Sequence, residues 1–413
     1  MISLPITKRY NTLNGVQKRG LHQATLFNDQ GSEYLITIGI GTPIQNFTLS
    51  LDTGSADLWV PSIECPTEQC PLARFNASES SSFQRINSSL FHVQYGIGSV
   101  NGTYGRDEIY LGEAHVSQQQ FGLASSTHDL IVVTSEKTNE ISNGIFGLGH
   151  PSLTTSKEKY EPFLYQLAKQ GKIDQAMFSI SMGARHHDGW SGEMLIGGIN
   201  NDKHVGEIQY AAVMENSTYW MVGGQSIQLI EEDKVTMNET FDGVRGMIID
   251  TGTTLTYVDH PLADRIVQSV VGGQNNVALD QMSGTYIVNC QAENLSKDNQ
   301  VHILLENDIV LEIPVKDLII PLDGKTIQEA TQCMFGIAPW MTTGTSAKMN
   351  EKGWILIGDS VLRSTYLVFD MKKNQIGFAK AAHLQEMMQS YANSVSPPSL
   401  AFLLFSVITL TLT

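Results

Sequence analysis

The sequence has few charged residues and no block of basic ones. Charged side chains make up 16% of the 413 residues, and 42 acidic against 26 basic residues give a formal net charge of −16. Because phosphate binding depends on clustered Lys and Arg, this composition argues against a nucleic-acid partner. An acidic surface also suits an acidic medium, since protonation of carboxylates reduces self-repulsion as the pH falls.

Long hydrophobic runs are missing as well. The uncharged apolar stretch at residues 400–413 has 14 residues, which is too few for a comfortable membrane span. It follows a polar spacer, Ser390 to Ser399, and the combination fits a signal for a glycosylphosphatidylinositol anchor at Ser390 or Asn393. A tail that is simply trimmed or packed is the alternative. Residues 1–20 contain basic residues but no apolar segment typical of a signal peptide, so we expect that the leader is missing from this chain.

Cysteine is scarce too, with four residues in the chain. Four cysteines allow three pairings, and their positions favour Cys65 with Cys70 and Cys290 with Cys333, one bridge in each half. Structural zinc needs closely spaced Cys or His pairs, and Cys290 and Cys333 lie far from any such pair. The two histidines at 186–187 lie in a polar, Gly-rich stretch typical of a solvated loop. We therefore expect neither a metal nor a cofactor.

One short signature occurs twice. Asp52-Thr53-Gly54-Ser55 and Asp250-Thr251-Gly252-Thr253 are 198 residues apart, and an apolar run precedes each Asp. An apolar strand delivers each Asp to the edge of the core, and the glycine allows the backbone to approach a partner closely. If the two copies face each other, their like charges cannot both be present, so one carboxyl stays protonated and the other acts as a base. Such a pair can activate a water for hydrolysis at acid pH.

The order of motifs around these signatures closely resembles the pepsin-like aspartic proteases, over residues 34–381. The run from Ile38 to Ser62 contains the first signature and Trp59 in the order and spacing of that family. The residues Tyr95-Gly96-Ile97-Gly98-Ser99 are similar to the family's flap, a hairpin that closes over the substrate. Ile145 to Gly149 and Leu356 to Asp359 resemble the segments that pass behind each catalytic loop. Taken alone, each motif would be an ordinary turn, hairpin or core residue.

The resemblance implies an all-β, bilobal fold with two lobes related by pseudo-two-fold symmetry and a few short helices. Two helices are predicted from the hydrophobic pattern, at residues 161–170 and 261–271. The length of the chain also favours two lobes. We expect a pro-segment remnant at 1–19, an N-terminal lobe at 20–184, a C-terminal lobe at 185–383, and a polar spacer with a hydrophobic tail at 384–413.

The resemblance also assigns roles to residues. Asp52 and Asp250 would form the water-activating dyad, with base and acid not distinguishable. Ser55 and Thr253 would hydrogen-bond the carboxylates, Thr53 and Thr251 would brace the two loops across the symmetry axis, and Gly54 and Gly252 would permit their close approach. Tyr95 would close the flap, supported by a hydrogen bond from Trp59. The spacing of the cysteines is also similar to that of the family. Typical members carry a further bridge before the second signature, but residues 237–245 contain no Cys, so the C-terminal lobe is expected to open more easily.

The function implied is that of an aspartic endopeptidase acting on proteins or peptides, with a monomer as the default state. If the tail is an anchor signal, the chain resembles the yapsin-type surface proteases, which favour basic residues at the cleavage site. The acidic insertion that many of them carry is absent between Cys65 and Cys70, and the flap residue Ile97 is apolar. We therefore predict cleavage between hydrophobic residues. The alternative is a catalytically silent peptide-binding or inhibitor protein on the same fold.

Seven Asn-x-Ser/Thr sequons and paired cysteines indicate the secretory pathway, with an extracellular or cell-surface location. The sequons begin at Asn46, Asn76, Asn87, Asn101, Asn216, Asn238 and Asn294. Glycan occupancy is doubtful at Asn46, beside a strand, and at Asn101, beside the flap. The dibasic pair Lys18-Arg19 suggests that a zymogen is cleaved after Arg19, which would leave Gly20 as the mature start; a frayed basic terminus is the alternative.

Overall fold

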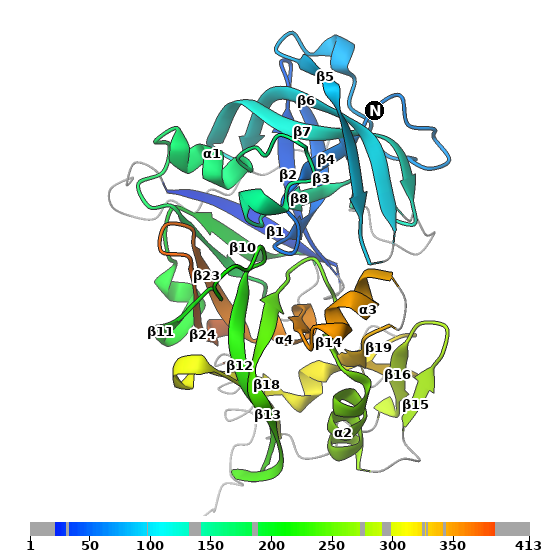
Figure 1. Cartoon of the computed structure of the whole chain (residues 1–413), viewed down its shortest axis with the longest axis vertical. Coiled ribbons are helices and arrows are strands. Elements are labelled where there is room, and N and C mark those ends of the chain that lie inside the picture. Colours follow the sequence, from blue (N-terminus) through cyan, green and yellow to red (C-terminus); the bar gives the residue numbers. More distant parts are fainter. Residues whose placement is uncertain are drawn as a thin grey trace, which may run out of the picture.

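The computed structural model describes residues 21–29, 33–96, 98–131, 142–183, 189–272, 277–290, 299–323, 327, 329–341 and 344–384. The chain forms two lobes, with α1 in the first and α2 and α3 in the second (Figure 1). Strands dominate both lobes and the helices are short, so the predicted all-β, bilobal fold is confirmed. The division into four segments at residues 19, 184 and 383 remains a prediction.

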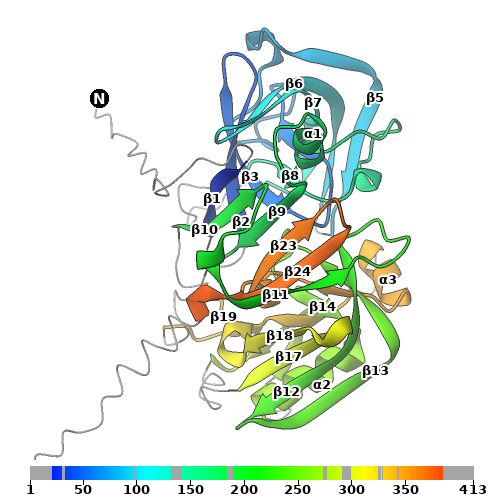
Figure 2. The same ribbon diagram turned by 90° about the vertical axis from the view of Figure 1, so that its left-hand side faces the viewer.

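A thirteen-stranded sheet joins the two lobes, in the order β11-β24-β23-β9-β10-β1-β2-β3-β8-β4-β7-β6-β5. Its first six strands come from both ends and the middle of the chain, and they lie side by side between the lobes (Figure 2). The strands of this sheet are β1 (His22–Asp29), β2 (Glu33–Ile40), β3 (Gln45–Asp52), β4 (Leu58–Pro61), β5 (Gln84–Gln94), β6 (Ser99–Leu111), β7 (Ala114–His128), β8 (Ile145–Gly147), β9 (Met177–Ser181), β10 (Gly189–Ile196), β11 (His204–Ala212), β23 (Thr365–Asp370) and β24 (Gln375–Ala381).

Two smaller sheets build the second lobe. The seven-stranded one has the order β18-β17-β12-β13-β22-β14-β21, and the four-stranded one has the order β15-β16-β20-β19. Their strands are β12 (Met221–Glu231), β13 (Lys234–Ile249), β14 (Thr256–Val258), β15 (Val277–Asp280), β16 (Thr285–Val288), β17 (Gln300–Leu305), β18 (Val310–Pro314), β19 (Ile319–Pro321), β20 (Cys333–Phe335), β21 (Ile337–Pro339) and β22 (Ile355–Ile357).

The helices begin and end where local chemistry allows. Helix α2 (His260–Val271) is capped by Asp259, whose side chain accepts a hydrogen bond from the N–H of Leu262, and it ends at Gly272 with a left-handed φ of 73°. Helix α1 (Phe163–Lys169) follows Pro162. Both predicted helices are confirmed. The remaining helices are α3 (Gly344–Glu351) and α4 (Asp359–Leu362), with short 3₁₀ turns at η1 (Ala77–Glu79), η2 (Pro151–Leu153), η3 (Asn201–Lys203), η6 (Glu306–Asp308) and η7 (Val315–Leu318).

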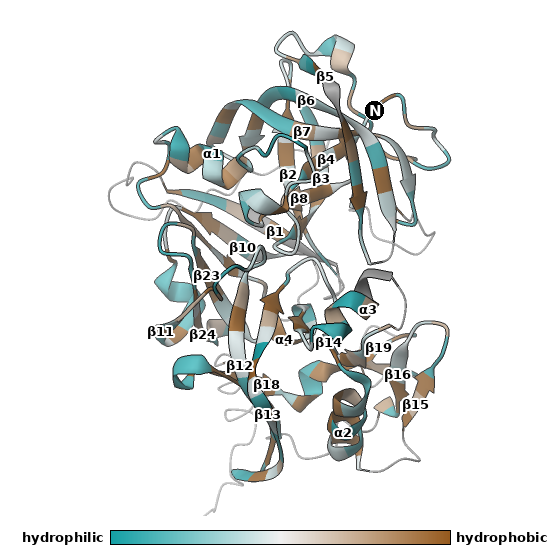
Figure 3. Cartoon of the chain, in the orientation of Figure 1, coloured by the Kyte–Doolittle hydropathy of each residue, from teal (hydrophilic) through white to brown (hydrophobic). Residues whose placement is uncertain are grey.

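The buried core extends through both lobes and includes the strand ends that precede the duplicated signature. Strand β3 alternates buried apolar residues with more exposed polar ones, and Phe47, Leu49 and Leu51 are 3%, 0% and 0% exposed. Hydrophobic colour is visible where β3 and its neighbour β8 lie together (Figure 3). In the second lobe, Met247, Ile248 and Ile249 at the end of β13 are all buried. Each apolar strand end is followed by one copy of the duplicated signature.

Candidate active site

Each lobe holds its Asp in the same way. Asp52 ends β3, and Asp250 directly follows β13. Behind the first loop, β8 pairs in parallel with β3, and behind the second, β22 pairs in parallel with β13. The C=O of Asp52 accepts from the N–H of Leu148 at 2.7 Å, while the N–H of Asp250 donates to the C=O of Ile357 at 3.0 Å. The two apolar-apolar-Gly segments therefore lie where the resemblance implies.

Both carboxyls are buried and are held by donors from their own loops. Asp52 and Asp250 are 6% and 7% exposed. Oδ1 of Asp52 accepts from the N–H of Gly54 at 2.8 Å and from that of Ser55 at 3.2 Å, and Oδ2 accepts from the hydroxyl of Ser55. Oδ1 of Asp250 accepts from the N–H of Gly252 at 2.9 Å, and Oδ2 accepts from the hydroxyl of Thr253 at 2.7 Å. These donors fix the orientation of each carboxyl.

The two loops are tied to each other by Thr53 and Thr251. The N–H of Thr53 donates to Oγ1 of Thr251 at 3.2 Å, and the N–H of Thr251 donates to Oγ1 of Thr53 at 3.0 Å. Each hydroxyl then donates to a carbonyl of the opposite strand, Thr53 to Ile249 at 2.7 Å and Thr251 to Leu51 at 3.0 Å. This exchange is symmetric between the lobes, so it keeps the two loops in register.

The glycines allow the two loops to approach each other. A Cβ at Gly54 would lie 2.7 Å from the carboxyl of Asp250, and a Cβ at Gly252 would lie 2.5 Å from Oδ1 of Asp52. No side chain tolerates such distances, so each glycine permits the carboxyl of the opposite lobe to reach the site.

The neighbouring carboxyl of Asp250 affects the ionisation of Asp52. Burial is the largest effect that raises the pKa of Asp52, and the charge of Asp250 raises it further. Hydrogen bonds from Ser55 and Gly54 act in the opposite direction. A buried carboxyl beside a second one therefore holds its proton to a higher pH than an isolated aspartate does.

The flap sequence forms the expected hairpin. Strands β5 and β6 pair with Gln94 opposite Ser99, and the N–H of Tyr95 donates to the C=O of Gly98 at 2.8 Å. The side chain of Tyr95 is half-buried, and its hydroxyl accepts from Nε1 of Trp59 at 2.9 Å. Burial first, and the charge of Asp52 second, raise the pKa of Tyr95. Gly96 is exposed, whereas Ile97 lies outside the described residues.

Comparison with known proteins agrees with this geometry. Residues 33–381 match the model of the eukaryotic aspartyl protease family. The chain belongs to this family. It is 31% identical over 351 residues to gastricsin of Oryctolagus cuniculus and 30% identical over 351 residues to gastricsin of Homo sapiens, matches that cover 84% of this chain and 81% of each relative. It is also 30% identical over 371 residues to mucorpepsin of Rhizomucor pusillus, which covers 86% of this chain and 81% of the relative. The similarity therefore extends over both lobes of this aspartyl protease.

The structure adds residues around the protease site that sequence reasoning missed. Asp57, in the run between Ser55 and Trp59, is 1% exposed and accepts hydrogen bonds from Tyr104 and Tyr160. A charged residue inside an otherwise apolar run was the available signal. Tyr219 lies on the C-lobe side, and after burial the charges of Asp250 and Asp52 raise its pKa. No sequence signal singled out Tyr219.

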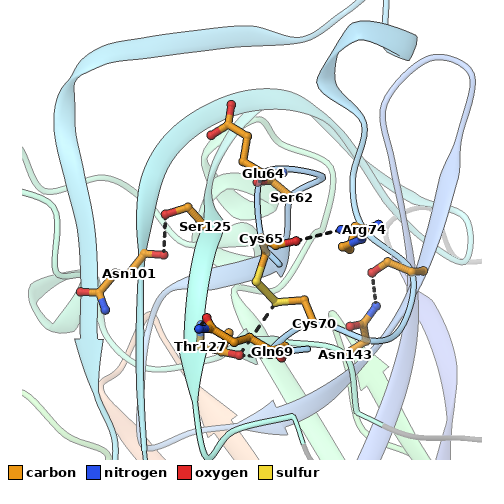
Figure 4. Close-up of a disulfide and its surroundings, with 11 residues drawn as sticks. Ser62, Glu64, Cys65, Gln69, Cys70, Arg74, Asn101, Ser125, Thr127 and Asn143 are labelled. Carbon is orange, nitrogen blue, oxygen red and sulfur yellow. Dashed lines mark hydrogen bonds between the residues drawn. A yellow bond between two sulfur atoms is a disulfide. The ribbon is translucent and has the colours of Figure 1, made fainter. Parts of the chain in front are cut away.

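Both predicted disulfides are present in the protease. Cys65 is bonded to Cys70 and Cys290 to Cys333, with sequence separations of 5 and 43 residues. Hydrogen bonds surround the first bridge (Figure 4): Arg74 Nη1 donates to the C=O of Cys65 at 2.8 Å, and the hydroxyl of Thr127 donates to the C=O of Gln69 at 2.9 Å. This bridge fixes a small loop in the first lobe, whereas the second closes a much longer one.

The predicted sequons differ in their surroundings. Asn46, Asn101, Asn216 and Asn238 are exposed, which makes them accessible to a modifying enzyme. Asn76 is half-buried and caps η1, and its side-chain NH₂ donates to Glu79 at 3.0 Å. Asn87 lies in β5, and Asn294 lies outside the described residues.

Within the described ranges, no group of three His, Cys, Asp or Glu residues could hold a metal ion. The same part of the chain contains no helix that is long and apolar enough to cross a membrane. The pair at 186–187, the dibasic pair at 18–19 and the tail at 385–413 lie outside the described residues.

Proposed function

We propose that this aspartyl protease hydrolyses peptide bonds with Asp52 and Asp250 as a pair that activates one water. The ionised carboxyl takes a proton from the water while the protonated one donates a hydrogen bond to the scissile carbonyl. The observation that carries the proposal is the symmetric exchange between Thr53 and Thr251, which holds two buried carboxyls against the glycines of opposite lobes. Such preorganisation is what transition-state stabilisation requires.

The proposal includes an acid optimum. Activity requires one proton on the pair, and the raised pKa of Asp52 keeps that proton bound above the range of an ordinary aspartate. As the pH rises through the pKa of the pair the proton is lost and activity falls. As the pH falls far enough both carboxyls become protonated and the base is lost. The rate should therefore rise and fall with two apparent pKa values that belong to the pair.

Substrates are proposed to be proteins or peptides with hydrophobic residues beside the cut. Leu130, Ile131 and Ile145 are partly buried apolar residues that pack, with Tyr95, against the cluster containing Trp59. The surroundings of Tyr95 are therefore apolar, which supports an apolar substrate residue over a desolvated Lys. A peptide-library profile dominated by Lys or Arg before the cut would overturn this part of the proposal.

The protein is proposed to be a glycoprotein of the secretory pathway that is made as a zymogen. Two disulfides support an oxidising compartment, and four exposed sequons support glycosylation. Cleavage after Arg19 would leave β1, which begins at His22, intact in the shared sheet. N-terminal sequencing of active secreted enzyme should give Gly20; an intact Met1 would contradict the zymogen. Phosphatidylinositol-specific phospholipase C should release the enzyme from cells if residues 384–413 contain an anchor signal.

The decisive experiment is hydrolysis of a quenched fluorescent protein substrate from about pH 2 to about pH 8. The wild type is compared with Asp250→Asn, with Asp174→Asn as the control, because Asp174 is an exposed aspartate outside the site. We expect activity at acid pH that pepstatin abolishes, no activity for Asp250→Asn, and wild-type activity for Asp174→Asn. If the processed wild type binds pepstatin without cleaving any substrate, the catalytically silent peptide-binding protein becomes the better reading.

A further inference from the structure

A further buried carboxylate lies directly behind the loop that holds Asp52. Asp57 is 1% exposed, and its Oδ1 accepts from the hydroxyls of Tyr104 at 2.8 Å and Tyr160 at 2.7 Å. Its Oδ2 accepts from the N–H of Thr155 at 2.8 Å. In the part of the chain that the structure describes, no lysine or arginine pairs with this carboxylate. Its charge is therefore met by three hydrogen-bond donors rather than by a cation.

The chemistry of these donors requires a carboxylate at this position. A carboxylate only accepts hydrogen bonds, so it can satisfy two phenols and an N–H at once. An asparagine has one oxygen and an NH₂ group that can only donate. Its NH₂ would therefore face one of the three groups that need an acceptor, the two phenols and the N–H of Thr155. Burial first, and the charge of Asp57 second, raise the pKa of both Tyr104 and Tyr160, which keeps the phenols protonated as donors.

These contacts lead from Asp57 to the flap. Tyr104 lies on β6, which is one arm of the flap hairpin, and its ring packs edge-on against Phe91 of β5 with centroids 5.3 Å apart. Phe91 in turn lies 6.4 Å from Trp59, whose indole N–H donates to Tyr95 at 2.9 Å. Tyr104, Phe91 and Trp59 belong to one buried cluster, against which Tyr95 and Tyr160 pack. The residues that Asp57 holds therefore pack against both arms of the flap and against the cluster that supports Tyr95.

The same carboxylate is tied to the catalytic loop. Asp57 follows Ser55 by two residues, and its C=O accepts from the N–H of Gly147, the residue paired with Asp52 across β3 and β8. The charge of Asp57 also contributes to the raised pKa of Tyr95, after burial and the charge of Asp52. One buried group thus contacts the base of the flap and the segment behind the dyad.

We propose that Asp57 is a positioning residue that fixes Tyr95 of the flap relative to the dyad through Tyr104, Phe91 and Trp59. The inference rests on the proposed function, because positioning the flap matters only if the dyad acts on a substrate that the flap covers. Asp57 does not touch the reacting atoms. Its contribution should therefore be seen in the rate of the correctly folded enzyme, and it should depend on the phenol of Tyr95.

The test measures kcat per active site, with sites counted by pepstatin titration so that misfolded protein does not contribute. We expect Asp57→Asn to lower kcat per site by about tenfold or more, because it removes charge-assisted hydrogen bonds to a buried group. Tyr160→Phe removes one donor and should lower kcat by a few-fold. Tyr165→Phe is the matched control, since its hydroxyl bonds to His150 at 3.0 Å outside this network, and it should retain the wild-type kcat.

A double-mutant cycle separates positioning from a merely structural role. In a Tyr95→Phe background Trp59 has no phenol to hold, so Asp57→Asn should cause a much smaller further loss than it does in the wild type. Equal fold losses of kcat in both backgrounds would overturn the proposal. It would also be overturned if Asp57→Asn had the same kcat per site as the control Tyr165→Phe. If Asp57→Asn does not fold, the same cycle is run with Tyr160→Phe. An inactive wild type would instead contradict the proposed function.

Discussion

Thr53 and Thr251 each donate an N–H to the hydroxyl of the other, at 3.2 and 3.0 Å, across the boundary between the two lobes. Each hydroxyl donates onward to the strand of the opposite lobe. The two residues are 0% and 1% exposed. Removing one hydroxyl would therefore leave a buried N–H and a buried C=O without partners.

We predict that Thr251→Val lowers both stability and activity. Valine has a similar shape but no hydroxyl, so the change should cost about 1–3 kcal/mol of unfolding free energy and reduce kcat by about tenfold or more. Thr53→Val should behave alike because the exchange is symmetric. Chemical denaturation and kcat per titrated site measure the two effects. Thr37→Val on the exposed face of β2 is the control; equal behaviour of Thr37→Val and Thr251→Val would contradict the prediction.

The sequence predicted the parts of the site that lie within a motif. Each Asp, its glycine and its threonine are adjacent in the chain, and an apolar strand precedes both copies, so the two loops could be derived from local pattern and duplication. The hydrogen bond from Trp59 to Tyr95 followed from the resemblance and is confirmed at 2.9 Å. The pairing of the cysteines is also confirmed.

The contacts that sequence reasoning missed join residues far apart in the chain. Tyr160 reaches Asp57 across 103 positions, from a segment with no periodic pattern, and only the packing of the lobe brings them together. His150 packs against Trp220, 70 residues away in the sequence, for the same reason. Long-range contacts of this kind depend on the fold rather than on local propensity, so a single sequence does not predict them.

The two disulfides are predicted to contribute unequally to stability. A bridge stabilises mainly by restricting the unfolded chain, so its contribution grows with the logarithm of the enclosed length. The separations of 43 and 5 residues predict that Cys290–Cys333 contributes about 2 kcal/mol more than Cys65–Cys70. Denaturation of the two double Cys→Ser variants measures the difference. A larger loss for Cys65/Cys70 would contradict the entropic explanation.

Arg245 lies in the segment, residues 237–245, that lacks the further disulfide typical of the family. Strand β13 leaves its register with β12 between Thr240 and Arg245, and the guanidinium lies 5.0 Å over the ring of Phe241 and 2.6 Å from Asp259. We predict that Arg245→Met costs about 1 kcal/mol, with a smaller loss at about 1 M salt because the ion pair is screened. Arg85→Met, which breaks a more exposed pair with Glu64, is the control and should cost less. A salt-independent loss would exclude an electrostatic restraint.

His150 is predicted to set the acid limit of stability. Its ring packs at a tilt of 38° against Trp220, with centroids 4.1 Å apart. Its Nδ1 lies 3.0 Å from the hydroxyl of Tyr165, and its Nε2 has no partner among the described residues. Burial lowers the pKa of His150 to about 4. The folded protein therefore binds this proton less readily than the unfolded chain does, and the neutral ring favours folding fully only above the unfolded pKa of about 6.5.

That contribution is lost as the pH falls through the window between about 6.5 and about 4, because the unfolded chain takes up the proton first. With allowance for solvent screening of the partly exposed ring, the loss is on the order of 1–2 kcal/mol. Trp220 also donates a hydrogen bond to the C=O of Leu148, behind the loop that holds Asp52. Protonation of His150 would therefore place a positive charge beside a residue that contacts this loop. We predict that His150→Phe narrows the difference in melting temperature between about pH 7 and about pH 3, whereas His128→Gln at an exposed site does not. If His150→Phe left the difference in melting temperature unchanged, the loss of stability at acid pH would have to come from other groups.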